Sequence, residues 1–364
     1  MTEQACAEAA AAALGGRGTL QGFSPHERAQ FVRWAARNRL AGLLWQVTGQ
    51  AGAGHDDWFD AACRQTAYAA YQDLELRRVV GELARTHIQP IFLKGTALAH
   101  TIYPDAALRP RADHDILVRA GEAAAVRTVF ERLGYEIELQ IPGGHVASQV
   151  SARRTDDRAM RYVFDIHLKI SNALAYADRL PYDEIRADAV SMPRLDAHAL
   201  APSPGHSFLI ACVHRVAHHF DADDLLWLYD IHLLARSLTE AEWARVVALA
   251  EAKQLCQVVV RGIERAGRVI GPSAPDQIVQ RLRECASREP QAPLVDSGTR
   301  TLDVVLADLA ALPDWRARLR LLAEHVMPPV WYMRRAYPQC PAPLLPLAYV
   351  YRIVRGARKW SRRR

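Results

Sequence analysis

The chain of 364 residues is long enough for one large or two ordinary domains, and half of it is apolar, which allows a sizeable core. Its net charge of +6 is concentrated at the C-terminus: the last 40 residues hold nine Arg or Lys and no acidic residue follows Glu324, so the remainder carries about −3. The basic balance therefore belongs to a tail and does not make the main body a nucleic-acid binder. No apolar run approaches the roughly 18 residues of a membrane span, and the alanine-rich N-terminus lacks a basic leader, so neither membrane spanning nor export is expected.

The cysteines are scattered along the chain, with no C-x-x-C pair and no Cys/His spacing that suits zinc. We expect ordinary thiols in a reducing cytoplasm at Cys6, Cys63, Cys212, Cys256, Cys285 and Cys340. The expected location is cytoplasmic, or peripheral to a membrane if the basic tail binds one.

The first half of the chain predicts helices followed by a small sheet. Residues 24–49 and 57–87 carry apolar positions at three- and four-residue spacing, which predicts two long helices. Residues 89–94 (QPIFLK) read as a first strand, followed by a helix over 96–103 with Thr96 at its cap. Further strands are expected at 114–120, 135–141, 145–151 and 161–170, with an amphipathic helix at 121–134 that Gly134 closes.

From residue 203 onward the apolar spacing is helical, apart from a linker or long loop at 287–293. The expected fold class is α+β, with a small mixed sheet between N-terminal helices and a C-terminal helical region. The expected division is a helical segment at 1–87, an α/β core at 88–200, a helical domain at 201–330 and a basic tail at 331–364.

Two aspartates at the start of one predicted strand are the strongest chemical signal. Residues two apart in a strand point to the same side, so Asp113 and Asp115 would present both carboxylates to one face. Hard oxygen ligands on a rigid element suit a magnesium ion that bridges nucleotide phosphates. Two-metal phosphoryl chemistry asks for a third carboxylate on a neighbouring strand, and Asp165 is the candidate. Asp165 could equally be an edge residue or a partner for Arg161.

The turn before these aspartates carries groups that could meet phosphates. Gly95 at the strand–helix junction leaves backbone N–H groups accessible, and Lys94 or Thr96 could add a charge or a hydroxyl. Arg109 and Arg111 just precede the aspartates, where guanidinium groups could pair with phosphate oxygens in a bidentate manner.

The stretch FLKGTALAHTIYPDAALRPRADHDILV at 92–118 resembles the core of an uncharacterised bacterial nucleotidyltransferase family within the DNA polymerase beta-like superfamily. FDIHLKI at 164–170 is similar to that family's acid-x-His strand, and the segment at 212–234 resembles its helical His and Asp segment. The resemblance implies that Gly95 shapes the phosphate turn and that Asp113, Asp115 and Asp165 hold Mg²⁺ or Mn²⁺. It also implies that Asp165 helps to activate the acceptor.

The implied reaction is transfer of a nucleoside monophosphate from a nucleoside triphosphate to an unknown acceptor, a small molecule, peptide or protein, with release of pyrophosphate. The chain departs from the superfamily in two places. Thr96 replaces the usual serine, and His114 replaces an aliphatic residue between the aspartates, so its imidazole would point into the core or the strand would begin one residue later. The alternative function is an inactive descendant that binds a nucleotide or a partner protein in a biosynthetic complex.

Two other segments leave alternatives open. His214 and His218 are four apart on a predicted helix and could hold a metal, but a hydrogen-bonded packing role with Asp230 as partner fits their apolar surroundings better. The helical end at 347–364 sets apolar residues beside arginines, which suits an anionic membrane surface, RNA phosphates, or merely a solvated basic end.

Overall fold

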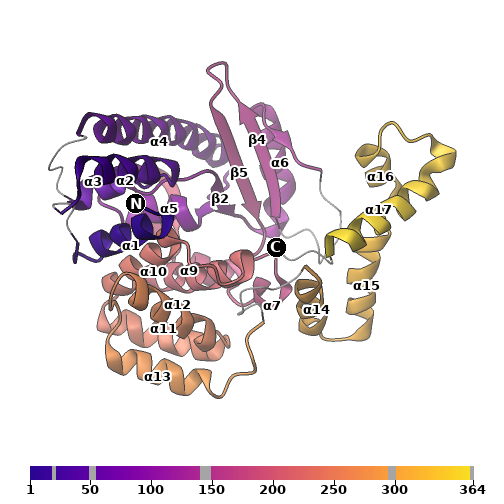
Figure 1. The fold of residues 1–364 in the computed structure, drawn as a ribbon. Coiled ribbons are helices and arrows are strands. Elements are labelled where there is room, and N and C mark those ends of the chain that lie inside the picture. The colour runs from indigo at the N-terminus through magenta and orange to yellow at the C-terminus, as the bar shows by residue number, and fades with distance from the viewer. Residues whose placement is uncertain (19–21, 49–54, 140–148, 294–300, 361–364) are drawn as a thin grey trace. The chain divides into compact units, whose positions relative to one another are not determined.

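The computed structural model describes residues 1–18, 22–48, 55–139, 149–293 and 301–360 (Figure 1). The chain forms two compact units, each built from three separate segments. Unit 1 comprises Met1–Ile116, Arg186–Cys212 and Asp223–Glu289; unit 2 comprises Leu117–Ile185, Val213–Ala222 and Pro290–Arg364. The four-part division along the sequence stays a prediction, because these units combine segments that are distant in the chain.

In the part of the chain that the structure describes, the sheet has seven strands in the order β3-β4-β5-β2-β1-β7-β6, with both parallel and antiparallel pairs. Together with the helices it confirms the α+β class. The strands are β1 (Ile91–Phe92), β2 (His114–Leu117), β3 (Glu136–Ile137), β4 (Gln149–Thr155), β5 (Arg161–His167), β6 (Val190–Met192) and β7 (Asp196–Ala201). Within unit 1, β1 runs parallel to β7 and β6 returns antiparallel to β7, so the sheet extends beyond the strands that the sequence predicted.

Unit 1 joins helices from both ends of its sequence. The N-terminal α1 contacts α10 and α12, and Arg17 next to α1 donates a hydrogen bond of 2.6 Å to the carbonyl of Ile270. The N-terminal helices therefore share a core with the later helical region. Its helices are α1 (Glu3–Leu14), α2 (Pro25–Arg37), α3 (Ala41–Thr48), α4 (His55–Ala84), α5 (Lys94–Thr101), α10 (Leu225–Ser237), α11 (Glu240–Ala252), α12 (Cys256–Val269) and α13 (Asp276–Ala286).

The first predicted long helix is wrong in one respect, because it is two helices. Ser24 and Glu27 form a capping box that starts α2, which ends at Arg37. Arg39 then adopts a left-handed conformation with φ of 60°, which no α-helix accommodates. The apolar spacing continues across this break, so periodicity alone did not reveal it.

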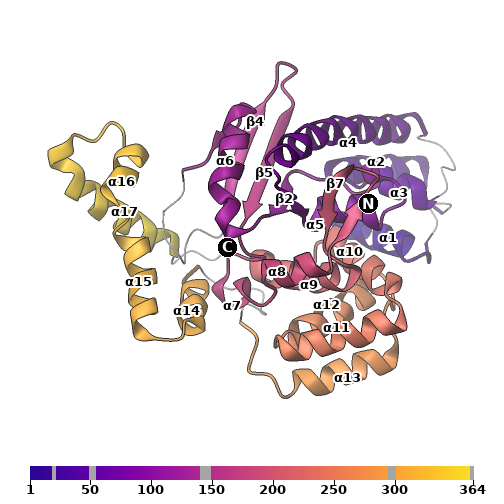
Figure 2. The same cartoon turned by 180° about the vertical axis from the view of Figure 1, so that it is seen from behind.

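In unit 2, α6 (Ala123–Arg132) covers one face of the β4–β5 pair, as Figure 2 shows from behind. Phe130 of α6 packs edge-on against Phe164 of β5 and Tyr135, with ring centroids 5.1 Å apart in each case. Gly134 follows α6 with φ of +82°, a conformation that favours glycine, which confirms it as the predicted end of this helix. The apolar alternation of β5 thus leaves Asp165 and His167 on the opposite face.

The remaining helices lie in or continue into unit 2. They are α7 (Leu174–Ala177), α8 (Tyr182–Ala187), α9 (Pro204–His219), α14 (Thr301–Ala311), α15 (Trp315–Val326), α16 (Val330–Ala336) and α17 (Leu345–Trp360). Across the described residues, no helix combines the length and apolar character that a membrane crossing requires.

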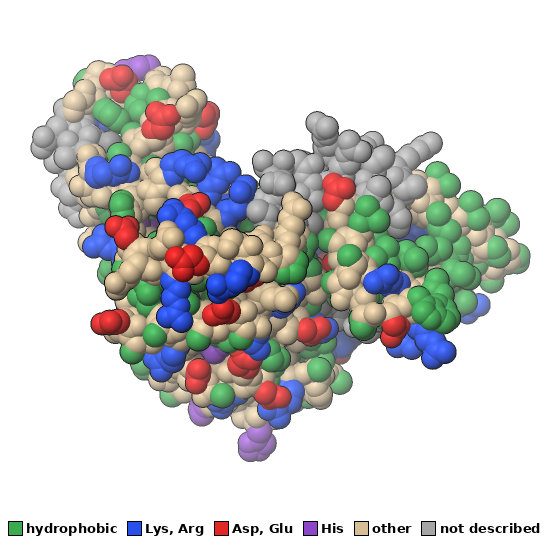
Figure 3. All heavy atoms as spheres, turned by 90° about the horizontal axis from the view of Figure 1, so that it is seen from below, with side chains coloured by type: hydrophobic (Ala, Val, Ile, Leu, Met, Phe, Trp, Pro, Cys, Tyr) green, Lys and Arg blue, Asp and Glu red, His purple; other side chains and the backbone are tan. Residues whose placement is uncertain are grey.

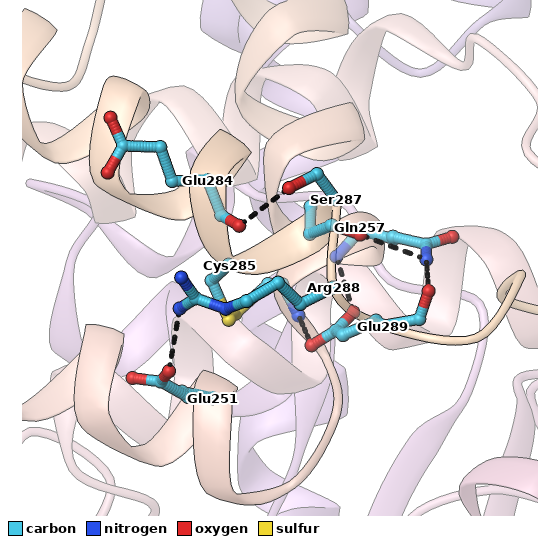
Figure 4. Close-up of a disulfide and its surroundings, with 9 residues drawn as sticks. Glu251, Gln257, Glu284, Cys285, Ser287, Arg288 and Glu289 are labelled. Atoms are coloured by element: carbon cyan, nitrogen blue, oxygen red, sulfur yellow. Dashed lines mark hydrogen bonds and ion pairs between the residues drawn. A yellow bond between two sulfur atoms is a disulfide. The ribbon is translucent and has the colours of Figure 1, made fainter.

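The expectation of six free thiols is wrong for two of them. Cys256 at the start of α12 and Cys285 near the end of α13 form a disulfide, and both are buried (Figure 4). Next to it, the carboxylate of Glu289 accepts hydrogen bonds from the backbone N–H groups of Cys256 and Gln257, at 2.8 and 3.0 Å. The two cysteines are 29 residues apart in sequence and meet only because α12 and α13 pack together.

Reduction of this disulfide is expected to lower the free energy of unfolding by about 3 kcal/mol, because a cross-link over this separation restricts the unfolded chain. Urea unfolding of the oxidised and reduced protein measures the difference, and a Cys256→Ser variant should respond no further to reductant. Equal unfolding midpoints for the oxidised and reduced wild type would contradict this expectation.

Candidate active site

The centre of the candidate site is β2, which carries Asp115 beside the turn that leads into α5. The backbone N–H of Leu93 donates a hydrogen bond of 2.9 Å to the carbonyl of Asp115, which registers this turn against β2. The strand begins at His114, so Asp113 lies just before it and is exposed, whereas Asp115 is buried. Asp113 therefore precedes the strand instead of beginning it, and the shared face of the two aspartates stays a prediction.

Lys94 lies against Asp115. Its Nζ donates to Oδ1 of Asp115 at 2.7 Å, and both side chains are almost inaccessible, at 12% and 9% exposure. Lys94 is also the left-handed residue of the turn, with φ of 50°. Such conformations are unfavourable for residues other than glycine and are often found at functional sites. The left-handed conformation of this turn is therefore at Lys94, one residue before Gly95, where the sequence predicted the conformational role.

The side chain of His114 points into the core, which was one of the two alternatives that the sequence left open. Its Nδ1 lies 2.9 Å from Oγ1 of Thr96 and its Nε2 lies 2.8 Å from Oε1 of Gln72. Burial, reinforced by the charge of Arg111, lowers the pKa of His114 to about 3, so the imidazole is neutral at physiological pH. Thr96 is buried with it and is not a helix cap, since α5 is preceded by Leu93 without a side-chain cap.

The low pKa of His114 predicts a loss of stability in acid. Between the ordinary pKa of 6.5 and the folded-state value of about 3, the unfolded chain binds a proton that the folded chain does not. The free energy of unfolding should therefore fall with decreasing pH by about 1.4 kcal/mol per unit from this group. Urea unfolding between pH 7 and 4.5 should show a shallower slope for His114→Leu than for wild type or for the exposed control His198→Leu. Equal slopes in all three would refute the assignment.

Arg109, a predicted phosphate ligand, lies buried in an ion pair with Asp230 of α10. Its Nε and Nη2 donate to the two carboxylate oxygens at 2.8 and 2.6 Å, and Tyr103 donates its hydroxyl to the same carboxylate at 2.8 Å. Burial alone would lower the pKa of Arg109, but the charge of Asp230 and the hydrogen bonds to it, together with the charges of Tyr103 and Asp224, outweigh burial and raise that pKa. The expected role of Asp230 as a partner of His214 or His218 is wrong, because its carboxylate is engaged by Arg109 and Tyr103.

Arg111 is buried in a second ion pair. Its Nη2 donates to Oδ1 of Asp73 on α4 at 2.7 Å, and His100 of α5 approaches the same oxygen at 3.2 Å. A Cβ atom built on Gly95 would meet Nη1 of Arg109 and Cγ of Arg111, each at 3.4 Å. The side chains of both arginines therefore pack against the turn at Gly95. Their phosphate-binding role stays a prediction.

In unit 2, Asp165 is held on β5, between β4 and β2 in the sheet order. Ser151 of β4 donates its hydroxyl to Oδ1 of Asp165 at 2.6 Å, so Asp165 is neither an edge residue nor paired with Arg161. His167 follows two residues later on the same face and is fully buried, and its carbonyl accepts a hydrogen bond of 3.0 Å from the N–H of Val118, just past β2. His167 was not among the predicted site residues, although its position two residues after Asp165 was the available signal.

The histidines of α9 form their own cluster. The Nε2 atoms of His214 and His219 lie 3.1 Å apart, and the rings of His214 and His218 are 5.0 Å apart. Across the described residues this cluster is not among the groups of three or more His, Cys, Asp or Glu that could hold a metal. The packing and metal-binding alternatives for His214 and His218 both stay predictions.

A comparison with protein-family models identifies the general reaction. No curated protein matches the chain. A model of a family described as "uncharacterised nucleotidyltransferase" matches residues 24–271, about two thirds of the chain, including the β1–α5 turn, β2 and β5. This chain is therefore a member of that uncharacterised nucleotidyltransferase family, and nucleotidyl transfer is its general class of reaction.

Proposed function

We propose that the protein is a metal-dependent nucleotidyltransferase of the DNA polymerase beta-like superfamily. It would transfer a nucleoside monophosphate from a nucleoside triphosphate to an unidentified acceptor. The observation that carries the proposal is the family match, whose residues include Asp113 and Asp115 of unit 1 and Asp165 of unit 2. Within unit 2, Asp165 and His167 lie on one face of β5, and within unit 1 β2 carries Asp115.

The donor atoms of these side chains suit a divalent cation. Carboxylate oxygens are the ligands that Mg²⁺ and Mn²⁺ prefer, and Asp113, exposed just before β2, could add another. His167 offers a nitrogen donor, which transition metals accept more readily than magnesium, so manganese should be tested beside magnesium. When bound, the cation would neutralise phosphate charge and orient the triphosphate.

The chain's own residues would perform the remaining tasks. Lys94, which donates to Asp115, could turn from it to a phosphate oxygen once a cation binds the carboxylate. Asp165, oriented by Ser151, would accept the proton of the acceptor hydroxyl as that oxygen attacks the α-phosphorus. The bond from the α-phosphorus to the bridging oxygen of the β-phosphate breaks, and pyrophosphate leaves in line.

The experiment is to incubate the purified chain with Mg²⁺ or Mn²⁺ and each α-labelled nucleoside triphosphate, and to measure pyrophosphate release and labelled product. Turnover or self-labelling that disappears in the Asp113→Ala/Asp115→Ala double variant would support the proposal and name the nucleotide. Turnover retained in that variant would refute the assigned site.

One observation favours the second candidate, an inactive nucleotide- or protein-binding module. The ammonium of Lys94 already neutralises Asp115 at 2.7 Å, so the fold does not need a cation there. His114 carries less weight for this reading, because its imidazole is accommodated by Thr96 and Gln72 within the core. Nucleotide binding that needs no divalent cation and leads to no turnover would select this candidate.

A further inference from the structure

We propose that α15, α16 and α17 form a surface that binds an anionic lipid bilayer without crossing it. This proposal is independent of the nucleotidyl transfer and concerns the C-terminal helices of unit 2. We call residues 315–356 the C-terminal module. Most of the large hydrophobic side chains that the described chain exposes lie in or just before it, between Leu306 and Val354, twelve of eighteen in all.

The module has only a small core of its own. Met333 of α16 and Leu345 and Ala348 of α17 are buried, with Tyr332 and Tyr349 packed against them. The hydroxyl of Tyr349 donates to the carbonyl of Pro328 at 2.6 Å. These contacts fix one side of α17 against α16.

The opposite side of α17 is also apolar. Leu347, Val350, Tyr351 and Val354 follow helical spacing along one stripe and are 63%, 56%, 57% and 49% exposed. A helix that is apolar on two sides normally has both sides buried against other elements, and the C-terminal module buries only one side of α17. We therefore expect the exposed stripe to bind a partner.

Two more exposed apolar groups come from the other helices. Trp315 and Leu319 lie one turn apart on α15, at 64% and 54% exposure. Val330 and Trp331 begin α16 at 50% and 54% exposure, just after Met327 at 72%. Figure 3 shows hydrophobic side chains gathered over this part of the molecule, on the right of the view, with Lys and Arg side chains among them. Contiguous apolar surfaces of this kind mark interaction sites.

The charges of the module decide which partner fits. Glu324 is its one acidic residue, whereas arginines accompany every helix, at positions 316, 318, 320, 334, 335, 352 and 355. Arg316 also lies over the ring of Trp315, 5.5 Å from its centroid. Apolar side chains interleaved with arginine and tryptophan fit the boundary between acyl chains and anionic head groups. Two copies of the module would repel each other.

The composition separates a bilayer from the other partners. Nine of the twelve exposed hydrophobic side chains are aliphatic. Proteins bind single-stranded RNA mainly through basic residues and aromatic rings that stack on the bases, so aliphatic side chains contribute little to an RNA site. The 16 residues of α17 span about 24 Å as a helix, shorter than the roughly 30 Å hydrocarbon core, and they include arginines. The helix is therefore expected to lie in the interface.

The test is co-sedimentation of the full chain with vesicles of phosphatidylcholine alone and with vesicles in which about 30% of the lipid is the anionic phosphatidylglycerol, since anionic lipids attract basic segments. We expect at least tenfold stronger binding to the anionic vesicles, weakened several-fold by raising the salt from about 0.1 to 0.5 M. Trp331→Ser/Leu347→Ser should lower binding to anionic vesicles at least tenfold. The matched control Leu74→Ser, in which an equally exposed leucine of α4 is replaced, should bind like wild type.

Four results of the vesicle assays would overturn the proposal. The first three are no binding to anionic vesicles, equal binding to neutral vesicles, and unchanged binding by Trp331→Ser/Leu347→Ser. The fourth is displacement of the wild-type chain from anionic vesicles by a single-stranded RNA probe to which Trp331→Ser/Leu347→Ser also binds. Light scattering completes the test: a dimer that Leu347→Ser dissociates would show that a second copy covers the surface instead.

Discussion

Replacing Asp115 by Asn is expected to lower the rate of nucleotidyl transfer by about a thousandfold or more. The substitution keeps the size of the side chain but removes the charge that would hold a divalent cation, and such cations contribute several kcal/mol of transition-state stabilisation. Asp165→Asn should cause a similar loss, because the same position would also accept the proton of the acceptor. The measurement is the initial rate of pyrophosphate release with the nucleotide that the wild type uses.

The matched control is Asp183→Asn. Asp183 pairs with Arg119 on the surface, with 79% of its side chain exposed, and its variant should retain the wild-type rate within about twofold. Because Asp115→Asn also alters the pair with Lys94, unfolding must be measured for each variant to separate lost chemistry from lost structure. A folded Asp115→Asn protein with the wild-type rate would remove Asp115 from the mechanism.

The largest effect on stability is expected from Arg109→Ala, about 3 to 5 kcal/mol in the free energy of unfolding. This substitution leaves the buried carboxylate of Asp230 without the guanidinium that neutralises it, and an uncompensated buried charge is costly. Urea unfolding at neutral pH measures the loss.

Asp223→Ala provides the contrast for this prediction. Asp223 pairs with Arg265 at the surface, where the two side chains are 39% and 26% exposed, and we expect a loss of no more than about 1 kcal/mol. The double variant Arg109→Met/Asp230→Leu, which removes both charges, should recover most of the stability. If Arg109→Ala instead kept full stability and lost nucleotide binding, the phosphate role predicted from the sequence would be the correct one.

The sequence predicted the order of elements around the site because local signals define it. A proline, a short apolar run and a glycine precede α5, and alternation marks β5. The short strands β6 and β7 escaped detection, since β7 is DAHALA, in which alanine has little strand preference and the alternation is weak. Their place in the sheet comes from pairing with β1, which joins residues more than 100 positions apart.

The roles of individual side chains were less predictable than their positions. Arg109 and Asp230 are 121 residues apart, and no local pattern tells an arginine that pairs with phosphate from one that pairs with a distant carboxylate. His114 looked like a defect between two aspartates, whereas Thr96 and Gln72 accept it in the core. The sequence predicts that Lys94 contacts phosphates. In the structure Lys94, and not Gly95, is the left-handed residue of the turn, and its ammonium contacts Asp115.

The most direct test of the central claim is the binding of Mn²⁺, followed by electron paramagnetic resonance, to the wild type, Asp115→Asn and Asp165→Asn in the presence of a non-hydrolysable nucleoside triphosphate. This measurement needs no acceptor. We expect the wild type to remove Mn²⁺ from solution only when the nucleotide is present, and each variant to bind it at least tenfold more weakly. Equal Mn²⁺ binding by all three proteins would contradict the assignment of these carboxylates to a metal site.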